Sequence, residues 1–115
     1  MTYKIYVSGK ITGLDPELAE KIFSIYAKAA LNTAEVMDNP NRVVINPLTI
    51  KPLFGIRRWF FFMWNDIRTL RKCTHIAMIP NWTDSMGATI EFFYAKFIRK
   101  IKVIELPEIK WRNEI

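Results

Sequence analysis

The sequence between His75 and Ala95 reads HIAMIPNWTDSMGATIEFFYA. Its apolar start, His75 to Ile79, predicts a buried strand, and a polar loop follows. The segment from about Ser85 onward predicts a helix that carries the carboxylate of Glu91 in its second turn. In open α/β sheets such a corner often holds a ligand, because backbone N–H groups converge at the helix start. The corner is therefore the first candidate for a functional site.

The rest of the chain repeats this alternation of strand and helix. Short β-rich or apolar runs predict four strands, at Tyr3–Ser8, Val43–Ile45, His75–Ile79 and Lys102–Leu106. Between them, helical spacing predicts helices from Asp15 to about Val36, from about Ile56 to Lys72, and from about Ser85 to Lys100. Alternating strands and helices imply βαβ units and a parallel sheet. We expect a flavodoxin-like (Rossmann-like) three-layer α/β sandwich with about four strands in the order 2-1-3-4.

The composition limits both size and partners. A chain of 115 residues with 50% hydrophobic and 24% charged residues suits a single globular domain, residues 1–115. The formal net charge is +6, from 17 Lys and Arg against 11 Asp and Glu. This charge favours anionic partners, namely nucleotides, nucleic acid or a membrane surface, although a solvated basic face explains it equally well.

Cysteine and histidine usage argues against a disulfide or a metal site. Cys73 and His75 are the single residues of their kinds, so neither an intrachain disulfide nor a zinc cluster is expected. The N-terminus has no signal-peptide pattern, and the apolar run Trp59 to Trp64 is too short to cross a bilayer. These features predict a cytoplasmic protein without a membrane association.

Two carboxylates lie on apolar helix faces. At about 100° per residue, Glu91 shares its face with small and apolar residues, Gly87, Ala88, Tyr94, Ala95 and Ile98. Asp66 likewise shares its face with Trp59, Phe62, Met63, Thr69, Leu70 and Cys73. A buried charge is costly unless it is paired or used, so two such residues suggest a shared pocket. The structural alternatives are an ion pair of Glu91 with Lys10, or local capping by Asp66.

Aromatic residues mark the opposite faces of the same two helices, at Phe60, Phe61, Trp64, Phe92 and Phe93. Aromatics interleaved with Arg can bind single-stranded nucleic acid, but on helices they are more typical of an interface between subunits. We therefore expect a homo-oligomer, such as a homodimer, through these faces, and no nucleic acid partner.

Several motifs, taken in order, resemble the nucleoside 2-deoxyribosyltransferase superfamily, and most closely its small phage and bacterial branch. The opening run Tyr6 to Gly13, YVSGKITG, is similar to the Y-x-S-G-P-I-T-G of that branch, with Lys10 in place of proline. Further matches follow at Asn46-Pro47, Asp66-Ile67, Leu70, Cys73, Asn81-Trp82, Ser85, Gly87-Ala88, Glu91 and Ala95. The resemblance covers nearly the whole chain.

The resemblance implies cleavage or exchange of the N-glycosidic bond of a (deoxy)nucleoside or its 5′-monophosphate, without a cofactor. Glu91 would be the nucleophile, Asp66 would help to protonate the leaving base, and Tyr6 would stand beside the nucleophile. Ser85 occupies the position where related monophosphate N-glycosidases bind phosphate. The implied substrate- and phosphate-binding residues are Ser8, Gly9, Lys10, Thr12, Ser85, Met86 and Gly87. The competing hypotheses are a non-catalytic nucleotide sensor or sponge, and a basic protein associated with phage nucleic acid.

Overall fold

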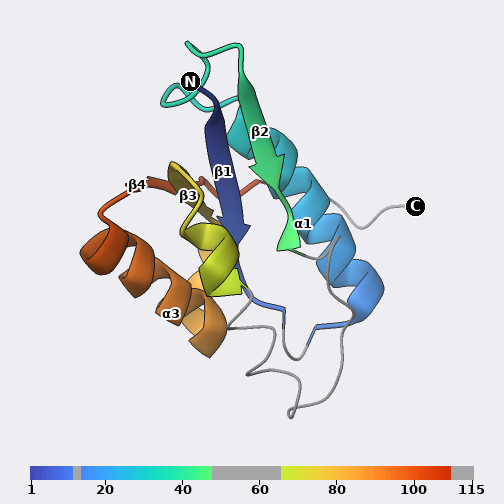
Figure 1. Ribbon diagram of the computed structural model, residues 1–115. Coiled ribbons are helices and arrows are strands. Elements are labelled where there is room, and N and C mark those ends of the chain that lie inside the picture. The colour runs from blue at the N-terminus through green and yellow to red at the C-terminus, as the bar shows by residue number, and fades with distance from the viewer. Residues whose placement is uncertain (12–13, 48–65, 110–115) are drawn as a thin grey trace.

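The computed structural model describes residues 1–11, 14–47 and 66–109. Its centre is a sheet of four parallel strands, β1 (Tyr3–Ser8), β2 (Arg42–Ile45), β3 (His75–Met78) and β4 (Lys102–Glu105). The strand order is β2-β1-β3-β4, which confirms the predicted order and the flavodoxin-like α/β fold (Figure 1). None of the helices in these ranges is long and apolar enough to cross a membrane.

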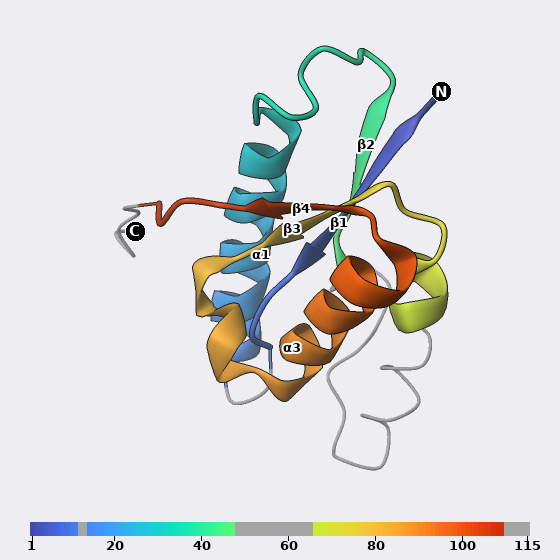
Figure 2. The same ribbon diagram turned by 90° about the vertical axis from the view of Figure 1, so that its left-hand side faces the viewer.

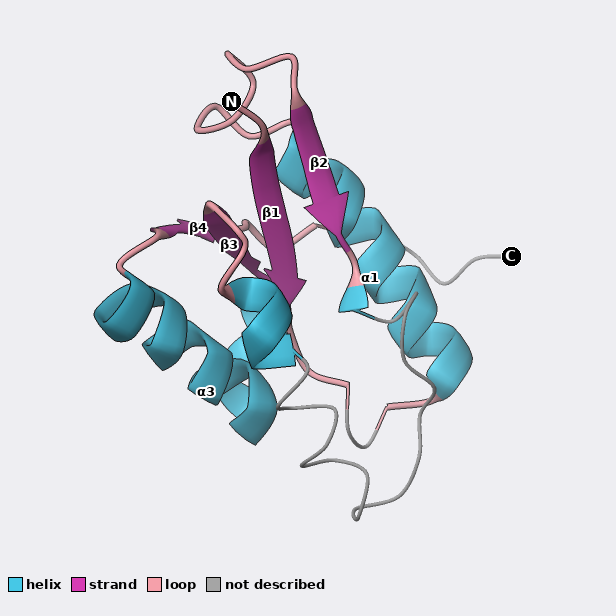
Figure 3. Ribbon diagram, in the orientation of Figure 1, coloured by secondary structure: helices cyan, strands magenta, loops and turns pink. Residues whose placement is uncertain are grey.

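Helices connect the strands (Figure 3). They are α1 (Pro16–Leu31), the 3₁₀ turn η2 (Pro80–Asp84), α3 (Met86–Phe93) and the π-helical η3 (Tyr94–Arg99). Residues 66–70 are also helical. The rest of the second predicted helix up to residue 65 lies outside the described residues, and so do its aromatic and apolar residues Trp59, Phe60, Phe61, Phe62, Met63 and Trp64.

The ends of α1 follow from its capping residues. The Asp15 side chain accepts a hydrogen bond from the Leu18 amide, and Pro16 fits the first helical position. The helix ends at Leu31, several residues before the predicted Val36. The reason is local, since the side chains of Asn32 and Thr33 donate to the carbonyls of Lys28 and Ala30 and so compete with further helical bonds.

The third helix changes its winding after Phe93. In η3 the turns widen to π-helical spacing, and the left-handed backbone of Lys100 (φ 55°) ends the helix. This change explains one wrong prediction. At α-helical spacing Ile98 would share the buried face of Glu91, but the wider turn rotates it outward, where it is 69% exposed.

The sheet is covered on both faces, which gives three layers. Figure 2 shows α1 and α3 on opposite sides of the strands. The first core cluster joins Ile5 and Val7 of β1 to Phe23 of α1, while the second contains Tyr6 with Leu70 and Ala95 from the other helical layer. Because side chains alternate along a strand, β1 sends its even-numbered residues toward the helices that carry Asp66 and Glu91.

Candidate functional site

Glu91 is held by two hydroxyl groups from β1. The Tyr6 hydroxyl donates to Oε2 at 2.9 Å, and the Ser8 hydroxyl donates to Oε1 at 2.6 Å. All three residues are buried, Glu91 with 5% of its surface exposed. Both carboxylate oxygens therefore accept a hydrogen bond from the same strand, which fixes the plane of the carboxylate.

The start of α3 places Glu91 against that strand. The Ser85 side chain accepts a hydrogen bond from the Ala88 amide at 3.2 Å, so the helix begins at Met86 and Glu91 falls in its second turn. Ala88 and Ala95 are buried one turn to either side, and their small side chains let the helix approach the sheet closely. Glu91 thus lies on the buried helix face, as its neighbours in the sequence predicted.

Asp66 meets the same phenol from a different helix. It begins the helical residues 66–70, is 4% exposed, and makes a side-chain hydrogen bond with Tyr6. Burial, the charge of Glu91 and the charge of Asp66, in that order, raise the pKa of Tyr6 well above the usual value of a phenol. Two buried carboxyl groups and one protonated hydroxyl therefore form a single connected cluster.

The loop after β1 is fixed by Asn81, which follows β3. The Asn81 side chain accepts a hydrogen bond from the Lys10 amide at 2.9 Å. A Cβ atom at Gly9 would lie 2.9 Å from Ile79 Cβ and 3.0 Å from Asn81 Oδ1, so only glycine allows this approach. The loop that carries Lys10 is thereby held against the η2 turn that precedes α3. Thr12, another candidate binding residue, lies outside the described residues.

The remaining candidate binding residues surround the start of α3. Ser85 and Gly87 are half-buried, and Met86 is exposed. The first amides of a helix have no acceptor within the helix, and a hydroxyl that accepts one hydrogen bond can still donate its own proton. Ser85 and these amides can therefore face an anion. The Ser8 hydroxyl, in contrast, is donated to Glu91, so its contact in this structure is with the carboxylate.

Two roles were not assigned from the sequence. Asn81 and Trp82 belong to the matching motifs, but the structure gives Asn81 its role in holding the Lys10 loop. Trp82 stacks on Phe92 with ring centroids 4.5 Å apart, which joins η2 to α3. An Asn directly after a strand end is the available signal for such a loop anchor. In the described ranges no three His, Cys, Asp or Glu side chains gather into a possible metal site.

Comparison with known proteins identifies a family. Residues 3–104 match the family described as Domain of unknown function (DUF4406). This match includes β1, β2, β3, all but the last residue of β4, and every candidate site residue described above. No curated protein and no solved structure is significantly similar to the chain.

Proposed function

The chain belongs to the DUF4406 family, whose function is unknown, and we propose that it cleaves or exchanges N-glycosidic bonds of (deoxy)nucleosides or their 5′-monophosphates. The observation that carries this proposal is the buried cluster in which Glu91 and Asp66 both contact the hydroxyl of Tyr6. Retaining glycoside chemistry needs such a pair, one carboxylate as nucleophile and one group as proton donor.

In the proposed first step, a carboxylate oxygen of Glu91 attacks the anomeric carbon C1′ of the nucleoside. The C1′–N bond breaks, its electron pair passes to the base nitrogen, and the base leaves with a proton. The product is a glycosyl ester of Glu91. In the second step, water or the nitrogen of another base attacks C1′, which releases the sugar or a new nucleoside and regenerates the carboxylate.

The hydrogen bonds of Tyr6 support the different roles of the two carboxyl groups. A phenol has one proton to donate, and in this structure Tyr6 donates it to Glu91. Asp66 contacts the same hydroxyl but begins a different helical segment, so the two carboxyl groups approach the phenol from separate elements. This arrangement suits Glu91, which two hydroxyl groups hold in a fixed orientation, as the nucleophile, and it leaves Asp66 as the group that assists the departing base.

The start of α3 supports a phosphorylated substrate. Ser85 and the amides of Met86 and Gly87 offer hydrogen-bond donors at the positive end of the helix dipole. Lys10 adds a cation in the loop that Asn81, in the η2 turn before α3, holds in place. A 5′-monophosphate placed here would lie two helical turns or less from Glu91, so a nucleotide fits the site better than a nucleoside.

The test measures release of free base. The protein is incubated with each deoxynucleoside and each 5′-monophosphate, and the products are separated by chromatography, with Glu91→Gln and the exposed-surface control Glu20→Gln in parallel. We expect base release by the wild type and the control, at a higher rate from the monophosphates, and none by Glu91→Gln. If all three proteins bind nucleotide but release no base, the site is that of a sensor and the enzymatic proposal fails.

A stripe of apolar side chains on α3 and η3 supports the proposal of a homo-oligomer. Its members recur at helical spacing and are exposed, namely Met86 (73%), Ile90 (39%), Phe93 (52%) and Phe97 (57%). The rings of Phe93 and Phe97 stack with centroids 5.5 Å apart, and Lys96 lies over the Phe97 ring. Aromatic residues and Met are enriched where subunits meet, and a two-fold interface uses one such patch twice.

Sedimentation velocity distinguishes a dimer from a monomer. We expect a dimer for the wild type and a monomer for the double variant Phe93→Ser/Phe97→Ser. Met37, which is also exposed but lies outside this stripe, in the turn between α1 and β2, provides the control Met37→Ser, which should remain dimeric. A monomeric wild type at high concentration would exclude this interface.

A further inference from the structure

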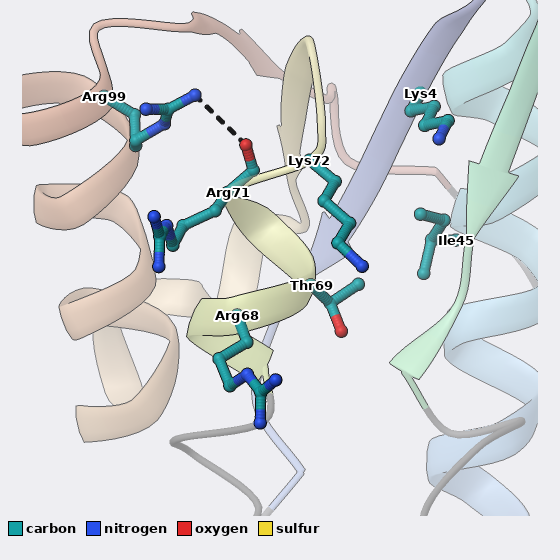
Figure 4. Close-up of a pocket in the computed structure, with 7 residues that line it drawn as sticks. All are labelled: Lys4, Ile45, Arg68, Thr69, Arg71, Lys72 and Arg99. Atoms are coloured by element: carbon teal, nitrogen blue, oxygen red, sulfur yellow. Dashed lines mark hydrogen bonds between the residues drawn. The ribbon is translucent and has the colours of Figure 1, made fainter.

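A basic groove lies outside the Glu91 site. It has a volume of about 690 Å³ and is lined by Lys4, Ile45, Arg68, Thr69, Arg71, Lys72 and Arg99 (Figure 4). Five of these residues carry a positive charge, and no described residue with a carboxylate lines the groove. A groove with this lining attracts anions and repels cations.

The groove and the Glu91 site lie on the same face of β1 but nearer opposite ends of that strand. Lys4 is near the amino end of β1, whereas Ser8 is its last residue and contacts Glu91. The helical residues 66–70 link the two regions, because Asp66 begins them and Thr69 lines the groove. The groove is therefore a second site, and neither Glu91 nor Tyr6 lines it.

The position of the charges is not explained by the helix alone. Basic residues often follow the last turn of a helix, where they compensate the negative end of its dipole, and Arg71 and Lys72 satisfy that rule. Lys4 and Arg99, however, come from β1 and η3. The Arg99 guanidinium donates to the Arg71 carbonyl at 3.1 Å, which holds the guanidinium beside the groove.

The shape of the cluster indicates an extended ligand. In Figure 4 the Lys72 side chain points toward the side where Lys4 and Ile45 lie, whereas Arg71 and Arg99 lie together on the side of α3. The cations are thus distributed around the end of a helix and do not converge on one point. Successive charges along a chain match this distribution better than one compact anion does.

We propose that this groove binds the phosphodiester backbone of a nucleic acid. Lys and Arg contacts with successive phosphates supply most of the affinity of such complexes, and the Thr69 hydroxyl suits a phosphate oxygen. No aromatic side chain from the described residues lines the groove, so the contact is with the backbone and is independent of base sequence. The aromatic helix faces in the sequence had predicted no nucleic acid partner. The groove brings together Lys4 and Arg99, which are 95 positions apart, so the sequence pattern alone did not indicate it.

Fluorescence anisotropy with labelled single-stranded and duplex oligonucleotides of mixed sequence tests the groove. The variant Arg71→Gln/Lys72→Gln is compared with the control Lys28→Gln/Lys102→Gln, whose residues are exposed and do not line the groove. Both remove two charges from the formal +6. If two phosphate contacts are lost, affinity near 0.1 M salt should fall about 25-fold for a single strand and about 60-fold for a duplex, and the salt dependence should become shallower.

The control variant and Glu91→Gln should bind as the wild type does, which separates this groove from the proposed active site. A loss of affinity of Arg71→Gln/Lys72→Gln for either the single-stranded or the duplex oligonucleotide supports the proposal. The oligonucleotide that binds more tightly shows which of the two forms of nucleic acid the groove prefers. An equal loss in both double variants would show that overall charge is responsible and would overturn the proposal. Binding of tripolyphosphate without binding of either oligonucleotide would also overturn it. If thermal melting shows that Arg71→Gln/Lys72→Gln is unfolded, Lys4→Gln/Arg68→Gln takes its place.

Discussion

Tyr6 and Glu91 are joined by a buried hydrogen bond of 2.9 Å between residues 85 positions apart in the sequence. The bond connects the sheet to the helix that carries the carboxylate. Because burial and two nearby carboxyl groups raise the pKa of Tyr6, the phenol keeps its proton throughout the neutral range. Tyr6 is therefore a permanent donor to Glu91, and it acts as a positioning residue for the proposed nucleophile.

Replacement of Tyr6 by Phe should weaken both the site and the fold. It removes a hydrogen bond to a charged group, for which roughly 1.5–3 kcal/mol is typical, so kcat for base release should fall roughly 10- to 150-fold. KM should change little, since the phenol holds Glu91 and not the phosphate. The matched control is Tyr26→Phe, because the Tyr26 hydroxyl is on the other face of the sheet, where it accepts from the Ile109 amide. Equal losses of kcat in the two variants would contradict a specific role for Tyr6.

Ser8→Ala should reduce stability because it leaves Oε1 of Glu91 without the 2.6 Å bond from β1. A buried acceptor that loses its partner costs about 1–3 kcal/mol, and the value is at the upper end when the acceptor is charged. Urea unfolding measures the difference. Ser24→Ala, in an exposed position of α1, should change the free energy of unfolding by less than about 0.5 kcal/mol. A Ser8 variant as stable as the Ser24 variant would mean that Glu91 finds another donor or water.

The sheet could be predicted because each strand is a short apolar or β-rich run between helices. All four strands appear within one residue of the predicted ends, as at Tyr3–Ser8 and Lys102–Glu105. Parallel strands buried on both faces give such continuous runs, and chain order then restricts their connections. The end of α1 and the buried face of the third helix were predicted less well, because the side-chain bonds of Asn32 and the π-helical turns after Phe93 depend on local geometry that apolar periodicity does not contain.

The candidate site was partly predictable for a related reason. Helical periodicity identified Glu91 and Asp66 as carboxylates on apolar faces, and both are buried. Tyr6, which contacts both carboxyl groups, could be placed beside Glu91 only from the family resemblance, because a tyrosine in a strand gives no sign of what it contacts. The bond from the Lys10 amide to Asn81 joins two loops 71 residues apart. Such contacts depend on how strands are placed side by side, which the local pattern does not specify.

His75 should make the stability of the protein depend on pH. It is 3% exposed, its Nδ1 lies 2.7 Å from the Thr74 hydroxyl, and its buried Nε2 has no hydrogen-bond partner in the described parts of the chain. Burial and the charge of Lys102 lower the pKa of His75, and the charges of Glu35 and Asp38 oppose the shift. The folded state therefore favours the neutral ring more strongly than the unfolded state does.

The sign of the effect follows from that difference. The unfolded chain binds the proton near pH 6.5, and the folded chain binds it only at lower pH, so stability is complete above that value and decreases as the pH falls through it. The slope for one proton is at most about 1.4 kcal/mol per pH unit. Urea unfolding between about pH 5 and 8 should show a smaller pH dependence for His75→Phe, which keeps a ring against Tyr3. Identical profiles would show that His75 is not responsible.

Cys73 should be unreactive in the folded protein. Burial, opposed by the charge of Lys4, raises the pKa of its thiol to about 11. The thiol also donates a hydrogen bond to the Thr69 carbonyl at 3.5 Å. Cys73 belongs to the second core cluster, and only 4% of its surface is exposed. At about pH 8 only about one thiol in a thousand is then ionised, whereas an ordinary thiol is roughly a quarter ionised, and the thiolate is the reactive form.

Labelling with Ellman's reagent should therefore be at least a hundredfold slower in the native protein than in guanidinium chloride. Rapid, complete labelling of the native protein would show that the helix 66–70 opens readily, and the Asp66–Tyr6 contact would then be formed only part of the time.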